Sequence, residues 1–413
     1  MKNKKILWII NQYANIPEFP GHTRQYEIAL GLVKRGWEVQ VFSSDFNLTT
    51  RNFYKLKGLD LTKHELIKGI NWHWLRVIPY KKNNYMRYLN LFSFCLNLAI
   101  QLSKFILLKN NRYKMPDIIL ASSPQLPATF LCLLYAKIFR KPFISEIRDL
   151  WPQVLIDLGG ISSKNTIIKV LICIEKFIYK NSNYVVVLAK GAEKYVRNKG
   201  ASNVVWLPNG PDLEKFKFAE IPSKNETFTF NRPFLIYYFG AHGIANGLEN
   251  LIAASKLIAD QPIKFILIGD GPLKKELMLK STKLKNIEFL NPIPKKDIPR
   301  IISKSDAILL SLKAIPLFKY GVSPNKLYDA YAIGRPVITT VEGEINKEVE
   351  KNFLGYTANG SRPKELADAC LKLLNTPKSE RIMMGKRARN LCEKVYSRKR
   401  ILDIYEKLFK QLI

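Results

Sequence analysis

Short uninterrupted runs of apolar residues alternate along the chain with longer segments in which apolar residues recur every three or four positions. The short runs are typical of strands buried on both faces of a parallel sheet, and the longer segments are typical of helices that pack on it. In the first half we predict strands at 5–10, 37–42, 117–121, 142–147, 184–188 and 204–207. A predicted helix at 23–35 joins the first two strands into a βαβ unit. This half is therefore expected to be a doubly wound α/β domain.

The same alternation starts again after residues 207–216, where Asn-Gly stands between two prolines and predicts a domain boundary. Further strands are expected at 234–239, 264–268, 287–290, 306–312 and 336–340, and the tail at 363–413 is expected to be mostly helical. The predicted fold class is α/β, with two doubly wound, Rossmann-like domains at 1–207 and 208–394. A C-terminal helix at about 395–413 is expected to pack back on the first domain.

The most apolar segment, residues 85–108, carries a narrow polar stripe formed by Asn90, Ser93, Asn97, Gln101 and Lys104. It is long enough to span a membrane, but it carries too many amides for a convincing span. Two interpretations stay open: a long helix packed on the domain, or an interfacial helix that contacts anionic lipid. The second is supported by tryptophans and tyrosines nearby and by basic flanks at Lys81, Lys82, Arg87, Lys109, Arg112 and Lys114.

Charge and cysteine content narrow the choice of partners. The formal net charge is +32, from 66 Lys+Arg against 34 Asp+Glu, which favours anionic partners. The lysines are spread along the chain, which argues against a nucleic-acid-binding arm and favours a membrane surface or a pyrophosphate ligand.

The N-terminal apolar run ends at Asn11, too early for a signal peptide. The cysteines lack metal or redox spacing and predict buried thiols in a cytoplasmic protein: Cys95, Cys132, Cys173, Cys370 and Cys392.

Residues 321–340 predict a loop, a short helix and a strand. Ser323 suits the N-cap, Pro324 the first helical position and Gly334 the residue after the helix. Lys326 and Asp329 share a face, so the helix start offers N–H groups and a cation to phosphate, and a carboxylate to sugar hydroxyls. This combination fits a nucleotide sugar. An ordinary capped helix with a solvated Lys–Asp pair is the alternative.

Two other predicted strands end in tight turns that lead into helices. The first turn contains Gly240, Gly243 and Gly247, and the second contains Gly271. Ligands in open α/β sheets gather at the carboxyl ends of strands, so these turns and the helix after Ser323 are expected to converge on one crevice.

Five segments together make nearly the whole chain resemble the retaining glycosyltransferases of family 4, and in particular their WbuB-like branch: 146–153, 208–210, 234–255, 267–277 and 323–338. The resemblance implies the GT-B fold, with two domains facing across a cleft. It also implies transfer of a sugar, such as an N-acetylated amino or deoxy sugar like N-acetylfucosamine, from a UDP-sugar to a lipid-diphosphate-linked glycan. The expected setting is bacterial surface polysaccharide synthesis on the cytoplasmic face of the plasma membrane, with no metal or other cofactor.

The resemblance also implies roles for single residues. Asp329 takes the ribose-binding position, while the position of the family's other donor-site acid falls on Gly321. The usual Arg and Lys of the diphosphate clamp align with Ala241 and Asn246, so Lys326 and the helix N-termini are expected to carry the phosphate charge. His242 helps if it is protonated. The remaining expected donor contacts are Gly21, His22, Gly240, Gly243, Gly271, Ile293, Val322, Ser323, Pro324 and Asn325, of which Gly21 and His22 are the weaker candidates.

Arg148 and Asp149 stand where many relatives have His-Asp beside the reacting centre. Asp149 is expected to accept a proton from the acceptor or to orient it, and Arg148 to contact a phosphate. A structural Arg–Asp pair is the alternative. Two other functions stay open: a sugar-nucleotide epimerase with the GT-B fold, and a non-enzymatic basic protein that binds lipid or nucleic acid.

Overall fold

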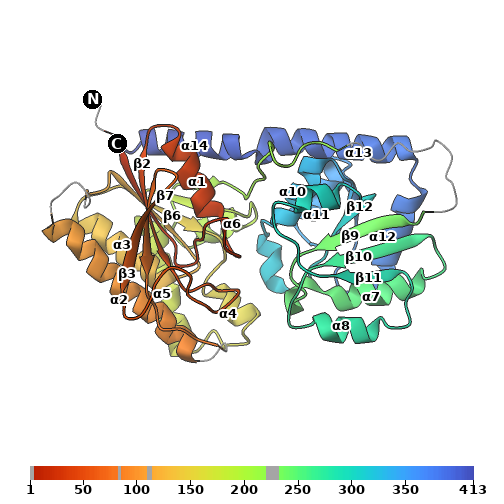
Figure 1. The fold of residues 1–413 in the computed structure, drawn as a ribbon, viewed down its shortest axis with the longest axis horizontal. Coiled ribbons are helices and arrows are strands. Elements are labelled where there is room, and N and C mark those ends of the chain that lie inside the picture. Colours follow the sequence, from red (N-terminus) through yellow and green to blue (C-terminus); the bar gives the residue numbers. More distant parts are fainter. Residues whose placement is uncertain (1–3, 82–84, 109–113, 220–231) are drawn as a thin grey trace. The chain divides into compact units, whose positions relative to one another are not determined.

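The computed structural model describes residues 4–81, 85–108, 114–219 and 232–413 (Figure 1). The chain divides into two compact units, which are Met1–Leu207 with Leu402–Ile413, and Pro208–Ile401. We call them unit 1 and unit 2. The first junction lies inside the segment in which the sequence places a boundary. The second lies within helix α14 (Arg398–Lys410), later in the chain than the expected position at about residue 395.

The described residues of unit 1 form a sheet of eight strands in the order β3-β4-β2-β1-β5-β6-β7-β8, and all neighbours are parallel except β3 and β4. Its strands are β1 (Ile6–Ile10), β2 (Glu38–Ser44), β3 (Thr62–Ile67), β4 (Ile70–Leu75), β5 (Ile118–Ser122), β6 (Phe143–Ile147), β7 (Tyr184–Val187) and β8 (Val204–Trp206). Its helices are α1 (Arg24–Val33), α2 (Tyr85–Leu107), α3 (Leu126–Ile138), α4 (Gln153–Asp157), α5 (Thr166–Asn181) and α6 (Ala192–Asn198). The six strands predicted for this half are confirmed.

The sequence prediction missed the hairpin formed by β3 and β4. The two strands are joined at Lys68 and Gly69, which both have positive φ angles of 50° and 85°. Two such residues are typical of a tight hairpin turn, but the first is usually Asn or Asp rather than Lys. The turn was therefore hard to recognise from the residues alone.

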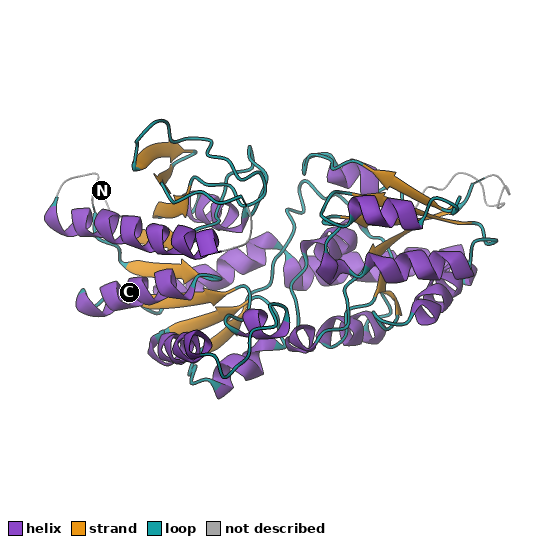
Figure 2. Cartoon of the chain, turned by 90° about the horizontal axis from the view of Figure 1, so that it is seen from below, coloured by secondary structure: helices purple, strands orange, loops and turns teal. Residues whose placement is uncertain are grey.

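Helices cover both faces of the unit 1 sheet (Figures 1 and 2). On one face α2 packs beside α3, and α3 beside α5. Phe105 of α2 meets Trp8 of β1, with ring centroids 4.5 Å apart. On the other face lie α1 and the C-terminal part of α14, where Phe409 meets Trp37 at 5.3 Å. The return of the chain's end to unit 1 thus rests on packing of apolar rings.

Helix α2 turns its polar stripe toward unit 1. Asn90 donates to the carbonyl of Ile78 at 2.7 Å, and Asn97 donates to the carbonyl of Leu61 at 2.9 Å. The opposite stripe is apolar and exposed: Tyr85, Tyr88, Leu89, Phe92, Leu96, Ile100 and Leu107. Of the helices in the described ranges, α2 alone has the length and apolar composition to cross a membrane. The flanking Lys82, Lys109 and Arg112 lie outside the described residues.

In the described residues of unit 2, six parallel strands follow the order β11-β10-β9-β12-β13-β14. This is the Rossmann order, with the switch point between β9 and β12. The strands are β9 (Phe234–Phe239), β10 (Ile263–Ile268), β11 (Ile287–Leu290), β12 (Ala307–Leu310), β13 (Val337–Thr339) and β14 (Gly355–Thr357). The first five confirm the sequence prediction. The edge strand β14 was missed because its three residues give no clear pattern.

The helices of unit 2 include α7 (Leu248–Leu257), α8 (Lys274–Lys280), α9 (Ile298–Ile302), α10 (Asn325–Ile333), α11 (Glu344–Lys351), α12 (Pro363–Asn375) and α13 (Lys378–Leu391). A buried apolar cluster joins α7 and α12 to β9, β10, β12 and β13. As the sequence predicts, Pro363 begins α12 and Pro377 separates α12 from α13. A π-helical turn, Cys392–Tyr396, follows α13 and leads to α14.

The cysteine prediction is partly wrong. Cys132, Cys370 and Cys392 are buried, but Cys95 is half-buried and Cys173 is exposed on α5. The apolar run around Cys173 suggested burial, whereas this side of α5 faces outward and carries apolar residues there.

Candidate functional site

The carboxyl ends of β9, β10 and β12 meet at the switch point of unit 2. Backbone hydrogen bonds tie their loops together: Gly240 N–H to Ile268 O at 2.8 Å, His242 N–H to Asp270 O at 2.8 Å, and Lys313 N–H to Ala245 O at 3.0 Å. The structure therefore brings together the turns that the sequence singled out.

Two glycines make this close approach possible. A Cβ at Gly269 would lie 1.9 Å from the carbonyl oxygen of Gly240, and a Cβ at Gly240 would lie 2.2 Å from Cε of Lys326. Gly240 also has φ +133°, a backbone conformation that side chains rarely adopt. The absent side chain at Gly240 leaves the space that Lys326 occupies.

Lys326 reaches from α10 across to the end of β9. Its ammonium donates to the hydroxyl of Tyr238 at 2.8 Å and lies 4.1 Å from the centroid of the Tyr238 ring. The same hydroxyl donates to the carbonyl of Ala241 at 2.6 Å, which links the lysine to the glycine-rich loop. Burial lowers the pKa of Lys326 from 10.5 to about 7. Sequence reasoning missed Tyr238, whose one signal is its position two residues before Gly240.

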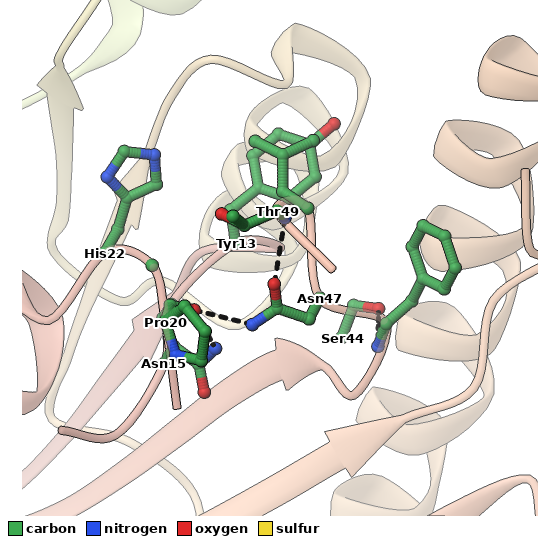
Figure 3. A pocket seen from close by; sticks show the side chains of 11 residues that line it. Tyr13, Asn15, Pro20, His22, Ser44, Asn47 and Thr49 are labelled. Atoms are coloured by element: carbon green, nitrogen blue, oxygen red, sulfur yellow. Dashed lines mark hydrogen bonds between the residues drawn. The ribbon is translucent and has the colours of Figure 1, made fainter. Parts of the chain in front are cut away.

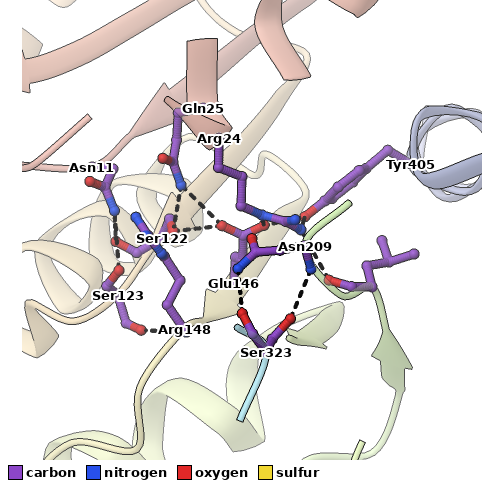
Figure 4. Close-up of polar contacts among 11 residues, drawn as sticks. Asn11, Arg24, Gln25, Ser122, Ser123, Glu146, Arg148, Asn209, Ser323 and Tyr405 are labelled. Carbon is purple, nitrogen blue, oxygen red and sulfur yellow. Dashed lines mark hydrogen bonds and ion pairs between the residues drawn. The ribbon is translucent and has the colours of Figure 1, made fainter. Parts of the chain in front are cut away.

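The start of α10 differs from the prediction at Ser323. The helix begins at Asn325 after an N-cap at Pro324, and no side chain caps it. The Ser323 hydroxyl instead accepts from the backbone N–H of Asn209 at 2.9 Å, while the Asn209 amide donates to the Ser323 carbonyl at 2.8 Å (Figure 4). The C-terminal end of α10 is as predicted, because Gly334 follows the helix in the left-handed conformation. Without a side-chain cap, the first N–H groups of α10 are available to an anion.

The condition under which His242 is expected to help, a protonated imidazole, is not favoured by its surroundings. Its side chain is fully buried, and neither ring nitrogen has a hydrogen-bond partner within the described ranges. Burial, with repulsion from Lys274 and Lys326, lowers the pKa of His242 to about 4. The imidazole is therefore neutral near pH 7 and offers one N–H donor and one acceptor.

The other predicted donor contacts lie around the same edge. Asp329 is buried on α10, and Gly321 precedes α10 with φ +83°. The carbonyl of Asn246 accepts from the Ser311 hydroxyl at 2.7 Å, which joins the loops after β9 and β12. A Cβ at Gly271 would lie 2.5 Å from the carbonyl of His242. Gly243 lies on the loop after β9 and Ile293 on the loop after β11. The others lie just before or at the start of α10: Val322, Pro324 and Asn325.

Arg148 and Asp149 belong to unit 1, in the loop after β6. The Arg148 N–H donates to the Ser123 hydroxyl at 2.9 Å, and Asp149 is exposed. No direct ion pair within the described part of the chain joins their side chains, but their charges act on each other: burial raises the pKa of Asp149, and attraction by Arg148 lowers it. A structural Arg–Asp pair therefore stays an alternative. Burial is the main influence on Arg148 and lowers its pKa.

Gly21 and His22 also lie in unit 1, beside a hollow of about 140 Å³ at the ends of β1 and β2 (Figure 3). The carbonyl of Pro20, just before them, accepts from Asn15 at 3.1 Å and from Asn47 at 2.6 Å. These bonds fix the backbone of the loop, while both Gly21 and His22 are exposed.

A buried charge cluster in unit 1 escaped sequence analysis (Figure 4). Arg24 of α1 pairs with Glu146 of β6 at 2.9 Å, and Glu146 also accepts from Ser122 at 2.7 Å and from Tyr405 of α14. Burial alone would raise the pKa of Glu146, but the attraction of Arg24 and these hydrogen bonds lower it. Arg24 also donates to the carbonyl of Leu207 at 3.0 Å. The cluster thus joins α1, β5, β6, α14 and Leu207, which are distant in the sequence of unit 1.

Within the described residues, no group of three or more His, Cys, Asp or Glu side chains is placed to hold a metal ion. The expectation that the protein needs no metal stays a prediction.

Comparison with known proteins finds a family model that matches the segment carrying the unit 2 site, and relatives of low identity. Residues 233–376 match the family model described as "Glycosyl transferases group 1". The chain is 24% identical over 272 residues to the glycosyltransferase WbjE of Pseudomonas aeruginosa, covering 62% of this chain and 66% of that protein. It is 26% identical over 282 residues to WcaI of Escherichia coli K12, whose name assigns it to colanic acid biosynthesis, covering 66% and 67%. The chain thus spans about two thirds of the length of these relatives.

Solved structures share the fold along nearly the whole chain. Sucrose-phosphate synthase from Thermosynechococcus elongatus matches with a TM-score of 0.74 and 15% identity, covering 99% of both chains. The Anabaena protein HepE, solved with UDP and glucose, matches with a TM-score of 0.68 and 16% identity, covering 99% of this chain and 100% of that one. The fold is therefore GT-B, with two parallel-sheet, Rossmann-like units.

Proposed function

We propose that the protein is a glycosyltransferase that binds a UDP-sugar at the switch point of unit 2. The observation that carries the proposal is the cation of Lys326, held against Gly240 and Tyr238 at the uncapped start of α10. A lysine and free helix N–H groups at the carboxyl edge of a Rossmann sheet suit a diphosphate. The family match at 233–376 covers this site, and HepE was solved with UDP, which supports a uridine nucleotide.

In this proposal Lys326 and the backbone N–H groups stabilise the charge that develops on the departing UDP. Asp329 holds the ribose hydroxyls, and His242, whose imidazole is buried and neutral, contributes its backbone to the loop after β9 without adding charge. The sugar gains oxocarbenium character as UDP leaves, and the acceptor hydroxyl attacks from the same face, so that the anomeric configuration is retained. Asp149 accepts the proton of that hydroxyl or orients it, and Arg148 contacts a phosphate.

The donor sugar is proposed to be an N-acetylated amino or deoxy sugar, for example N-acetylfucosamine. The absence of a carboxylate at Gly321 supports this choice, because an acid there would bind hydroxyls that such sugars lack or replace. Backbone groups near Gly321 and Val322 would then contact the sugar. The name of WcaI, which assigns it to colanic acid biosynthesis, supports a role in a bacterial surface polysaccharide, such as O-antigen or capsule.

The acceptor is proposed to be a lipid-diphosphate-linked glycan, reached from the cytoplasmic face of the plasma membrane. The support is α2, whose amides face unit 1 while its outer stripe is apolar. A surface helix whose outer face meets only water buries its apolar stripe and exposes its polar one. The exposed Tyr85, Phe92 and Leu96 would enter the interface, and the charge of +32 would attract anionic lipid.

Nucleotide binding is tested by a thermal shift screen of UDP, GDP and TDP, followed by UDP-sugars, because a ligand that binds only the folded state stabilises it. We expect UDP to stabilise the protein most. Replacing Lys326 with Ala should lower turnover by about 10²–10³-fold while the fold stays intact. Near-normal turnover in Lys326→Ala would refute the assignment.

Two further measurements separate the alternatives. An epimerase would convert the UDP-sugar when no acceptor is present, whereas a transferase needs the acceptor for product. Membrane contact is tested by sedimentation with vesicles that contain or lack anionic lipid, using Phe92→Ser on α2 and Phe353→Ser, an exposed site in unit 2, as its control. Equal sedimentation of both variants and the wild type with both kinds of vesicle would contradict membrane docking through α2.

A further inference from the structure

A cavity of about 560 Å³ lies within unit 1, beside the loops that follow β5 and β6. Ligand cavities commonly measure about 300–1,000 Å³, so this one has room for part of a large ligand. Its wall is formed by α2, the start of α3, α4 and α5, and it is lined mostly by apolar side chains. They include Leu91, Phe92, Leu126, Trp151, Leu155 and Leu171. None of the donor-site residues of unit 2 takes part in it.

The wall has one charged side chain among its described residues, Arg87 of α2. Tyr13 and Gln125 line the same wall as Arg87, and burial raises the pKa of Tyr13 while Arg87 and Gln125 lower it, so these polar groups lie near one another in an otherwise apolar wall. Tyr13 also lines the smaller hollow that contains Gly21 and His22 (Figure 3). The polar place of the cavity therefore adjoins a second, more polar hollow. This arrangement suits a ligand with a long apolar part and an anionic group at one end.

The cavity is continuous with the outer apolar stripe of α2. Tyr88, Phe92 and Ile167 line the cavity, yet they are 56%, 67% and 68% exposed. A hydrocarbon chain that leaves a membrane at this surface would enter the cavity without crossing a polar barrier. Water binds poorly in this cavity, because the mostly apolar wall offers it few hydrogen-bond partners.

We propose that this cavity binds the isoprenoid chain of the acceptor lipid, with Arg87 on its diphosphate. The inference rests on the proposed function and names the part of the acceptor that unit 1 recognises. It also gives a role to Trp151 and Leu155, apolar side chains that follow Asp149 closely in sequence and line the cavity.

The test measures binding of geranylgeranyl diphosphate to the full chain by isothermal titration calorimetry, with excess UDP present to occupy the donor site. Two matched ligands serve as controls. Geranylgeraniol lacks the diphosphate, and inorganic pyrophosphate lacks the prenyl chain. Cys95→Phe fills the cavity, because Cys95 lies in its wall. Leu96→Phe is the control on the same helix, because Leu96 is 54% exposed and does not line the cavity.

We expect Cys95→Phe to weaken binding of geranylgeranyl diphosphate by about tenfold or more, and Leu96→Phe to leave it within about twofold. Arg87→Gln should weaken the diphosphate by about tenfold and leave geranylgeraniol unchanged. Equal effects of Cys95→Phe and Leu96→Phe, or binding no tighter than that of pyrophosphate, would overturn the proposal.

Photolabelling of the wild-type protein with a photoreactive prenyl diphosphate tests the cavity without any variant, so the result does not depend on how a variant folds. Labels on Leu155 or Leu171 support the cavity, and labels confined to residues outside its wall overturn it. If UDP-sugar transfer to a lipid acceptor survives in Cys95→Phe, the cavity proposal alone fails. If the cavity binds the prenyl chain but UDP does not bind, the proposed function fails.

Discussion

Burial of the Lys326 ammonium should make UDP binding depend on pH. The pKa of Lys326 is lowered to about 7, so in the free protein about half of the molecules carry its charge at pH 7 and about one tenth at pH 8. A bound diphosphate compensates the cation and raises its pKa toward the ordinary value. Binding should therefore take up about half a proton at pH 7 and about 0.9 proton at pH 8.

The contacts of Lys326 oppose the lowering of its pKa by burial, so the sizes of the two effects have to be compared. The difference between 10.5 and about 7 corresponds to roughly 5 kcal/mol of cost to the charged form. The hydrogen bond to Tyr238 favours the charged form by about 1.5–3 kcal/mol, and the ring beneath it adds about 0.5–2 kcal/mol. Burial has the larger effect over most of this range, so the pKa lies between about 7, the value with burial alone, and the ordinary 10.5. To the extent that these contacts raise it, the same proton uptake occurs at correspondingly higher pH. Because the neutral form must take up a proton, the dissociation constant should rise with pH, by up to about tenfold per pH unit above the pKa.

Isothermal titration calorimetry in two buffers with different ionisation enthalpies measures the proton uptake directly. The useful range is pH 7.5 to 9, where the terminal phosphate of UDP, with a pKa of about 6, is already ionised. Lys326→Met should bind UDP weakly and take up no proton. Lys275→Met, at an exposed lysine of α8, is the matched control and should behave as the wild type. A constant dissociation constant and no proton uptake in the wild type would refute the reasoning.

Three further substitutions probe the groups that support the two units. Tyr238→Phe removes the hydroxyl between Lys326 and the glycine-rich loop, and should lower kcat/KM by about tenfold, measured by initial rates at several pH values. Asn209→Ala removes the hydrogen bond from the Asn209 amide to the Ser323 carbonyl, keeps the bond from the backbone N–H, and should weaken UDP by up to about tenfold in calorimetry, whereas an unchanged affinity would show that the loop needs no such support. Arg24→Ala leaves the Glu146 carboxylate buried without its partner and should cost about 3–5 kcal/mol in urea unfolding. The double replacement Arg24→Met with Glu146→Leu should recover most of that loss, and failure to do so would contradict the ion-pair explanation.

Candidate site residues on one element, or just after a strand, could be named from the sequence. Lys326, Asp329 and Gly240 were found in this way, because glycine turns, helix starts and strand ends leave local marks. Asn209 was noted as part of a boundary, but its bonds to Ser323 were not foreseen. The N-cap role given to Ser323 was wrong for the same reason, since a hydroxyl near a helix start can bind a partner distant in sequence instead.

The state of each group was decided by its surroundings. The sequence showed a lysine and a histidine, whereas burial in the folded chain lowers the pKa of both, so that His242 is neutral and Lys326 titrates near pH 7. The amides of α2 are a second case. Their spacing defined a stripe, but only packing against the backbone of residues 61–78 decided that it faces inward and leaves the apolar stripe outside.

The sequence by itself determined the two α/β units, the positions of their main strands along the chain and the loops at the carboxyl edge of the second sheet. Apolar periodicity, glycines and prolines are local, and they act within a few residues of where they stand. Only the tertiary structure decided the contact of Lys326 with Tyr238, the Arg24–Glu146 pair and the cavity under α2. These depend on burial and on contacts between residues far apart in the chain, which no short stretch of sequence contains.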